Sequence, residues 1–250
     1  MIGYMVIMGV FTVAGMVISG KLKSVFKKYS QYGTSSGMTG KEIAEAMLAH
    51  YNIYDVKVVA GKGSLTDHYN PMTKTIALSE PVYGARSISA AAVAAHECGH
   101  AVQHATSYAM LGMRSKLVPV VNFSAKVQQF LFMGMMFGLA GGLVNPMLMT
   151  RILAATFGVT ALFSLVTLPV EFDASKRALA WLDETGTTHG AEYDGAKEAL
   201  WWAAMTYVSQ ALMALAMFLY FALRMMGSSC LLYTSPSPRD ATLSRMPSSA

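Results

Sequence analysis

Residues 88–106 read ISAAAVAAHECGHAVQHAT, an alanine-rich stretch that predicts a helix. Within it, His96, Glu97 and His100 form the pattern HExxH. Positions i and i+4 lie on one face of a helix, one turn apart, so two imidazoles placed there can bind the same metal ion. Glu97 projects beside His96 and is free for another role. We therefore expect one helix to bring two metal ligands and a carboxylate together.

The HExxH pattern indicates a catalytic zinc ion. Zinc binds neutral imidazoles at about 2.1 Å in a tetrahedral arrangement, and its catalytic sites keep one position for water. The ion lowers the pKa of that water toward about 7, and Glu97 is placed to accept its proton and pass it to a departing amine. A chance match on a surface helix is the alternative, but with six histidines in 250 residues it is expected in fewer than roughly one chain in a hundred. We predict one Zn²⁺ and a zinc metalloendopeptidase, a hydrolase with a protein or peptide substrate.

The composition is typical of a membrane protein. Apolar residues make up 54% of the chain and charged residues 13%, whereas about a quarter of an ordinary soluble domain is charged. The net charge of +5 comes from Lys and Arg beside apolar segments and not from a basic stripe interleaved with aromatics. The expected partner is therefore the lipid bilayer, and no nucleic acid is expected. The two cysteines, Cys98 and Cys230, predict no disulfide.

Apolar segments divide the chain. Residues 1–19 are uncharged and precede a cluster of lysines, which predicts a retained transmembrane anchor. Residues 127–170 contain two apolar runs around a short break and predict a transmembrane hairpin, and residues 199–224 predict a further span. Lys and Arg crowd residues 21–126 and return at 176–197, so both polar regions are expected on the cytoplasmic side. The expected fold class is mainly α: a multi-pass protein of the cell membrane with about four transmembrane helices and a small α+β zinc-metalloprotease-like cytoplasmic domain.

The polar regions carry the expected catalytic domain. Residues 30–116 form the catalytic region with the HExxH helix, and residues 171–198 form a cytoplasmic helical segment. The shorter elements predicted in the first region are a helix at 41–50, strands at 56–59 and 73–79, a turn-rich stretch at 65–71 and a helix N-cap at Ser87 or Ser89. Residues 228–250 are rich in Ser and Pro, resemble translated adapter sequence, and are interpreted as a non-native tail.

A catalytic zinc ion needs a third protein ligand. The candidates in the second polar region are acidic or histidine side chains: Glu171, Asp173, Glu184, His189, Glu192 and Asp194. Glu171 is favoured because it follows an apolar run on the membrane side expected for His96, where a carboxylate is costly unless it is paired or coordinated. Its segment, EFDASKRALAWL, predicts a helix that begins at Glu171, so a partner of the helix dipole is the alternative role.

Two further residues of the motif helix have other expected roles. His104 lies two turns, about 11 Å, from His96 and is too far away to share its ion. We expect His104 either to hydrogen-bond to a metal-ligating side chain or to have a packing role only. Cys98 points away from the histidine face and is expected to be a small packed residue.

Two longer stretches resemble a known family. DHYNPMTKTIALSEPVYGARSISAAAVAAHECGHAVQHA (67–105) and LPVEFDASKRAL (168–179) are similar to the YugP-type membrane zinc metallopeptidases, and the resemblance extends over residues 1–225. It implies that His96 and His100 are zinc ligands and that Glu97 is the catalytic base. By analogy with the wider HExxH-plus-Glu, gluzincin-like proteases, such as the HtpX and CAAX-prenyl proteases, it implies Glu171 as the third ligand.

The resemblance also bears on the surroundings of the ion. Those relatives place an Asp four residues after the ligand Glu to brace a zinc histidine; here that position is Ser175, with Asp173 nearby, so the identity of the brace stays open. Proteases of this kind bind substrate as an extra strand, and an ordinary structural strand is the alternative. The hypothetical substrate strand comprises Thr73, Thr75, Ile76 and Ala77. The residues expected in the cleft, where a Tyr or His can steady an oxyanion, are Asp67, His68 and Tyr69.

Two other functions fit part of the sequence. A site-two-type intramembrane protease also carries HExxH on an apolar helix but takes its third ligand from an Asp-Gly motif, and Asp194-Gly195 lies outside the predicted spans. A non-catalytic, zinc-stabilised membrane scaffold would need four protein ligands, often thiolates, and outside the tail only Cys98 is available. The sequence indicates neither a particular substrate nor an oligomeric state.

Overall fold

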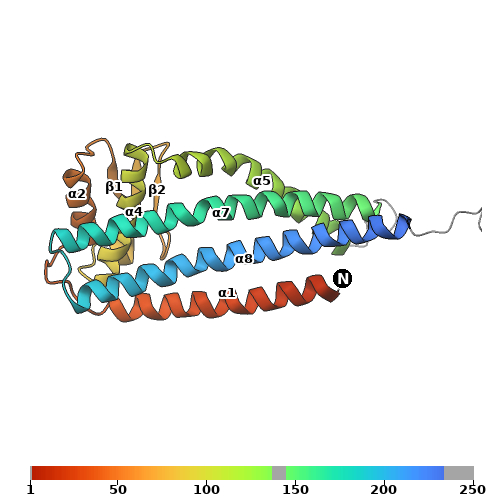
Figure 1. Cartoon of the computed structure of the whole chain (residues 1–250). Helices are drawn as coiled ribbons and strands as arrows, with labels where there is room; N and C mark the ends of the chain where they lie inside the picture. Colours follow the sequence, from red (N-terminus) through yellow and green to blue (C-terminus); the bar gives the residue numbers. More distant parts are fainter. Residues whose placement is uncertain (1, 137–144, 234–250) are drawn as a thin grey trace, which may run out of the picture.

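The structure, a computed structural model, describes residues 2–136 and 145–233. Its elements in chain order are α1 (Ile2–Tyr29), α2 (Gly40–His50), β1 (Lys57–Gly61), β2 (His68–Asn70), β3 (Thr75–Ser79), α3 (Glu80–Tyr83), α4 (Ile88–Ala105), α5 (Ala109–Met136), α7 (Pro146–Glu184) and α8 (Ala191–Tyr233). The long helices α1, α8, α7 and α5 lie side by side, and the short elements gather at one end of them (Figure 1). The expectation of a mainly helical chain with a small sheet is confirmed.

Three helices among the described residues are long and apolar enough to cross a membrane: Ile2–Tyr29, Pro146–Glu184 and Ala191–Met226. This corrects the expected number of about four. The fourth expected span, at 127–144, falls partly in α5 and partly outside the described residues. In α5 the charged side chains Arg114, Lys116 and Lys126, together with Pro119, precede the apolar end of the helix, so the described apolar remainder up to Met136 is too short by itself to span a bilayer.

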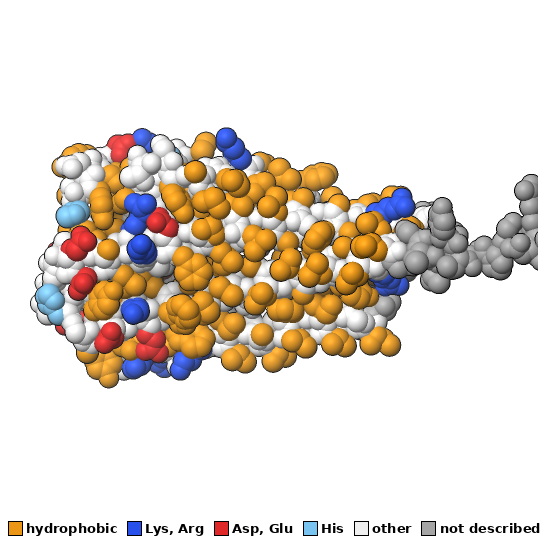
Figure 2. Space-filling view, in the orientation of Figure 1, with side chains coloured by type: hydrophobic (Ala, Val, Ile, Leu, Met, Phe, Trp, Pro, Cys, Tyr) orange, Lys and Arg blue, Asp and Glu red, His pale blue; other side chains and the backbone are white. Residues whose placement is uncertain are grey.

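Polar and apolar side chains separate along the molecule. On the face shown in Figure 2, apolar side chains cover the body formed by the long helices, and acidic and histidine side chains gather at the end that holds the short elements. Several Lys and Arg side chains mark the border between the two parts (Figure 2). Lys and Arg side chains at the end of an apolar helical body are typical of the boundary of a membrane-spanning region.

Helix α7 is continuous where the sequence suggested a new helix. It runs from Pro146 to Glu184 through Pro169, so Glu171 lies inside the helix and not at its first turn. The prediction that a helix begins at Glu171 is wrong, and the helix-dipole role falls with it. The sequence changes from apolar to polar at Glu171, but the helix itself continues, although Pro169 has no amide to donate to the preceding turn.

The small sheet has the strand order β1-β3-β2. β1 pairs in parallel with β3, with Val58 opposite Ile76, and β2 pairs antiparallel to β3, with Tyr69 opposite Ile76. The strands expected at 56–59 and 73–79 are confirmed to within two residues, whereas β2 was not predicted and lies in the stretch expected to be turn-rich. Ile76 and Leu78 are fully buried under the helices.

Helix α4 forms the centre of the polar end. Ser87 is its N-cap and accepts a hydrogen bond from the Ala90 amide, which settles the choice between the two serines. The helix packs against α2, α7 and α8, and most of its side chains are buried. Cys98 is fully buried and its thiol donates to the Ala44 carbonyl at 3.4 Å, so the expectation of a packed cysteine is confirmed.

Candidate metal centre

The side chains of His96, His100 and Glu171 meet where α4 crosses α7. The Glu171 Oε2 atom lies 3.4 Å from His96 Nε2 and 3.6 Å from His100 Nε2. One possible ligand atom from each residue lies within 4.8 Å of the other two. Of the six third-ligand candidates, Glu171 alone joins this cluster in the part of the chain that the structure describes. Asp194, which the intramembrane-protease alternative needs, is not part of it.

His100 is held by a chain of hydrogen bonds. Its Nδ1 lies 3.0 Å from the Gln103 amide oxygen. The Gln103 Nε2 group donates to the Val170 carbonyl and to Asp173 Oδ2, both at 2.8 Å, which fixes the amide with its oxygen toward His100. Because that oxygen can only accept, Nδ1 carries a proton in both the neutral and the charged imidazole, and Nε2 is the nitrogen that remains to bind a metal ion.

Asp173 therefore acts through Gln103 and does not touch a histidine. Its Oδ2 atom also accepts a hydrogen bond from Arg177 Nε at 2.6 Å, one turn further along α7. The sequence suggested that Asp173 lies near the ion, but it did not identify the side chain through which Asp173 acts. Gln103 was missed, although its position three residues after His100 puts it on the same helix face.

His96 is held by Ser175. The Ser175 hydroxyl oxygen lies 3.1 Å from His96 Nδ1, across the α4–α7 contact. Ser175 stands four residues after Glu171, so both side chains leave α7 on the same face. The position at which similar proteases carry an Asp thus keeps its contact with a histidine, through a neutral hydroxyl in place of a carboxylate.

Glu171 is almost fully buried, with 2% of its side chain exposed. Its second oxygen, Oε1, lies 3.1 Å from Arg114 Nη1 of α5, an ion pair without hydrogen-bond geometry. Among the described residues, neither carboxylate oxygen accepts a hydrogen bond. Arg114 was missed by the sequence analysis because nothing in its local pattern relates it to a residue 57 positions away (171 − 114). A buried carboxylate with an orphaned oxygen is a group that a cation would satisfy.

The electrostatics around His100 favour positive charge. Burial lowers the pKa of its imidazole, but the neighbouring carboxylates Glu171 and Glu97 outweigh burial, and the pKa is raised above its ordinary value. The same negative surroundings attract a metal cation, whose binding displaces the proton.

A cavity of about 270 Å³ opens onto the three side chains. Its lining comes from β2 and the residues that flank it, and from α4, α5, α7 and α8; it comprises Asp67, His68, Tyr69, Pro71, His96, Glu97, His100, Leu111, Arg114, Ser115, Val118, Glu171 and Tyr207. Glu97 is buried and faces the same space as the two histidines. The three residues expected in the cleft do line it. Tyr207 was missed, because it lies in residues 199–224, which were interpreted only as a transmembrane span.

Two of the cleft residues also hold the fold. The Asp67 carboxylate accepts hydrogen bonds from the amide and hydroxyl of Ser79 at 2.7 and 3.0 Å, which ties the loop before β2 to the end of β3. Tyr69 shares a hydrogen bond of 2.7 Å with His104 Nδ1. His104 is exposed. Its hydrogen bond with Tyr69 places its ring against β2, so it does not support His96 or His100 from behind.

The expected substrate strand has no free edge. β3 is the central strand and pairs with β1 on one side and β2 on the other, so Thr75, Ile76 and Ala77 cannot accept a further strand. Thr73 lies in the turn that joins β2 to β3. The hypothesis is therefore wrong for this strand, because β2 occupies its second edge. The sequence did not predict β2.

Comparisons with known proteins agree with this geometry. Residues 4–226 match the model of a family described as "Putative neutral zinc metallopeptidase". Over 203 residues the chain is 45% identical to "Putative membrane protease YugP" of Bacillus subtilis, an alignment that covers 81% of this chain and 88% of that protein. No solved structure gives a significant match. Because the family model covers most of the chain, including the HExxH helix and the segment that carries Glu171, this chain belongs to that family of zinc metallopeptidases.

Proposed function

We propose that this protein is a membrane-bound zinc metalloendopeptidase with His96, His100 and Glu171 as metal ligands and Glu97 as general base. The observation that carries the proposal is the meeting of one possible ligand atom from each of the three residues within 4.8 Å, beside a cavity that Glu97 also lines.

The donor set fits zinc. Two imidazole nitrogens and one carboxylate oxygen are the ligands of one common class of catalytic zinc sites, which leave the fourth position to water or substrate. The remaining nitrogen of each imidazole is already engaged, His96 by Ser175 and His100 by Gln103, so both Nε2 atoms are presented to one point. When bound, zinc supplies a Lewis acid that polarises a carbonyl and lowers the pKa of water toward about 7.

The chain itself supplies the proton transfers. Glu97 faces the cavity from the same helix as both histidines and accepts the proton of the attacking water. It then donates that proton to the leaving amine of the peptide bond. Arg114 holds Oε1 of Glu171, which leaves Oε2 turned toward the histidines. Tyr207, Tyr69 and His68 line the cavity as possible donors to a developing oxyanion.

One edge of the sheet lies beside this cavity and is available to pair with a substrate segment. β2 is an edge strand in the described sheet, and two of its residues, His68 and Tyr69, line the cavity. An extended peptide paired with β2 would run past Glu97, so we assign to β2 the strand-pairing role. Because the cavity lies at the polar end of the long helices, the expected substrates are protein segments in the cytoplasm or next to the membrane surface.

The experiment is a comparison of purified full chain in detergent with two variants, using an unfolded protein such as casein as substrate. Glu97→Gln is expected to retain about one zinc per chain and to lose at least roughly 10²-fold in cleavage rate, because only the base is removed. Glu171→Gln is expected to lose both zinc and activity, while Asp194→Asn keeps both.

The same set of variants tests the alternatives. Loss of zinc in Asp194→Asn, with retention in Glu171→Gln, would support the intramembrane-protease alternative. A zinc-loaded, folded wild type that cleaves no faster than Glu97→Gln, both in detergent and in cells, would support a scaffold and sink the proposal.

A further inference from the structure

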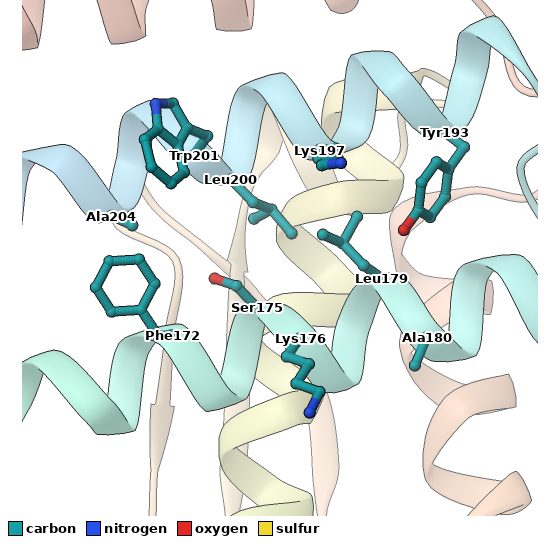
Figure 3. A pocket seen from close by; sticks show the side chains of 10 residues that line it. All are labelled: Phe172, Ser175, Lys176, Leu179, Ala180, Tyr193, Lys197, Leu200, Trp201 and Ala204. Atoms are coloured by element: carbon teal, nitrogen blue, oxygen red, sulfur yellow. The ribbon is translucent and has the colours of Figure 1, made fainter.

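A second hollow lies between α7 and α8, on the other side of Ser175 from the metal centre. It has a volume of about 330 Å³. Its lining residues are Phe172, Ser175, Lys176, Leu179 and Ala180 of α7 and Tyr193, Lys197, Leu200, Trp201 and Ala204 of α8 (Figure 3). We call it the α7–α8 groove.

The groove is apolar with two cationic side chains. Phe172, Trp201 and Ala204 lie together at one end, and Lys176 and Lys197 lie further along, before Tyr193 (Figure 3). Among the residues that the structure describes, neither lysine forms an ion pair, and the groove lining includes no carboxylate. The aromatic rings are open to the outside, with 39% of Phe172 and 55% of Trp201 exposed. The groove therefore offers an apolar surface and uncompensated positive charge side by side.

Along the long helices, the α7–α8 groove lies at the border between the apolar body and the polar end. The uncharged run of α7 ends at Val170, and that of α8 begins at Ala199, so the two lysines lie on the polar side of both limits. Lys21, the first lysine of α1, lies 5.9 Å from the ring of Trp202, which puts the lysines of α1 at the same level. Tryptophan and lysine at such a level mark the interface between hydrocarbon and headgroups.

We propose that the α7–α8 groove binds one anionic phospholipid from the surrounding leaflet. The phosphate lies between Lys176 and Lys197, and an acyl chain runs from there over Leu200 and Ala204 between the rings of Phe172 and Trp201. The charge of the groove is complementary to an anionic headgroup, and its apolar end faces the hydrocarbon that supplies the chain. A zwitterionic lipid would bring an ammonium group next to two unpaired lysines.

The lipid would touch a residue that also contacts the metal centre. Ser175 lines the groove, and its hydroxyl lies 3.1 Å from His96 Nδ1. An occupied groove would thus exclude water from the outer side of this contact.

Native mass spectrometry of the full chain in detergent, titrated with phosphatidylglycerol or phosphatidylcholine, tests the proposal. The wild type is expected to retain one phosphatidylglycerol with at least about tenfold preference, since each lysine near an anionic lipid contributes about fivefold. The paired change Lys176→Gln with Lys197→Gln is expected to reduce this preference to less than about threefold. The matched control is Lys23→Gln with Lys27→Gln, which removes the same charge from exposed lysines of α1 outside the groove and is expected to keep the preference.

Two further arms separate the possible occupants. Ala204→Phe fills the apolar end and is expected to weaken binding of both lipids, with circular dichroism and metal content as checks that the fold is kept. Excess inorganic phosphate is expected not to displace the lipid, because the acyl chain contributes. Equal loss of preference in the control pair, unchanged preference in the groove pair, or full displacement by phosphate would each overturn the proposal. So would a wild-type dimer that only the groove variants dissociate, since a second copy would then occupy the groove.

Discussion

Each histidine of the metal centre is held by a different kind of contact. His96 meets a serine hydroxyl, while His100 meets an amide that is itself fixed by a backbone carbonyl and by Asp173. Partners behind a ligand orient the imidazole and fix its tautomer, and their loss commonly weakens metal binding by about 10–100-fold. The stronger support at this site is therefore the one at His100.

The first prediction concerns Gln103. Gln103→Leu removes the acceptor for His100 Nδ1 and the amide that links it to Asp173, so zinc affinity is expected to fall by about 10–100-fold. Competition with a chelator of known affinity measures the change. Gln128→Leu is the matched control, because among the described residues the Gln128 amide on α5 makes one long hydrogen bond, of 3.5 Å, to Thr160. Equal zinc affinity in the wild type and in Gln103→Leu would show that Gln103 does not contribute to zinc binding.

The second prediction concerns Arg114. Arg114→Met leaves the buried Glu171 carboxylate without its cation. Loss of one partner of a fully buried pair lowers the free energy of unfolding by several kcal/mol. Because Arg114 is partly exposed, we expect a smaller loss of about 1–3 kcal/mol. Zinc provides a replacement partner, so the loss of thermal stability should be larger in the metal-free protein than in the zinc-loaded protein. Lys116→Met, which removes a charge from the exposed side of α5, should lower neither melting temperature by more than about 1–2 °C. The same loss with and without zinc would contradict the assignment of Arg114 to Glu171.

At the scale of elements, the metal centre depends on how closely α4 approaches α7. Gly99 lies between the two histidines on α4, and a Cβ at that position would lie 2.6 Å from the Ala174 carbonyl oxygen of α7. The absent side chain lets the backbones approach, and this approach brings Glu171 and Ser175 to the histidines. A glycine can permit such an approach anywhere on a helix, and only the structure identifies Ala174 of α7 as the neighbour.

The third prediction follows from this approach. Gly99→Ala forces α4 and α7 apart, and overpacking of this kind costs about 1–3 kcal/mol in spite of the better helix propensity of alanine. The variant is expected to unfold at a lower temperature in detergent and to bind zinc more weakly. Gly112→Ala on α5 is the control, because a Cβ at that position meets no atom of another described element within 4 Å, and it should be neutral or stabilising by up to about 1 kcal/mol. A Gly99→Ala protein as stable as the control would show that the contact is loose.

At the scale of the whole molecule, a metal ion bound by His96, His100 and Glu171 would tie together three parts of the chain. α4 belongs to the polar end, α7 crosses the apolar body, and α5 contributes the arginine behind Glu171. A ligand that binds only the folded state stabilises it according to its concentration and affinity, by about 2.7 kcal/mol at one hundred times Kd. Zinc should therefore stabilise the fold as a whole and not only the site.

The fourth prediction is the effect of metal removal. Chelation of the wild type is expected to lower its apparent melting temperature, and added zinc is expected to restore it, since an ion held by His96, His100 and Glu171 would link α4 to α7. Glu171→Gln should melt at a temperature that neither chelator nor zinc changes. If chelation left the wild type unaffected while metal analysis confirmed the loss of zinc, the link between α4 and α7 would not depend on the ion.

The fifth prediction concerns orientation in the membrane. With Cys230→Ser as background, Ile2→Cys lies at the apolar start of α1, and Ser64→Cys lies in the exposed loop between β1 and β2 at the polar end. A membrane-impermeant maleimide is expected to label Ile2→Cys in intact cells and Ser64→Cys only after permeabilisation. The reverse result would place the metal centre outside the cytoplasm.

The sequence by itself determined the features that depend on local geometry. The spacing of His96 and His100 places both on one face of any α-helix, and Glu97 between them needs no tertiary information. The apolar runs predict membrane helices through their length, and the strands at β1 and β3 follow from local alternation. Glu171 was favoured because membrane topology limits which polar residues can return to the side of His96.

Only the tertiary structure decided how distant segments meet. That β3 is a central strand depends on its pairing with β2, a three-residue strand whose own sequence suggests a turn. The contacts of Arg114 with Glu171, of Gln103 with Val170 and of Ser175 with His96 all join separate helices. A repeat of 3.6 residues fixes which side chains share a face, but the rotation and separation of two packed helices depend on every side chain between them, including the one that is absent at Gly99.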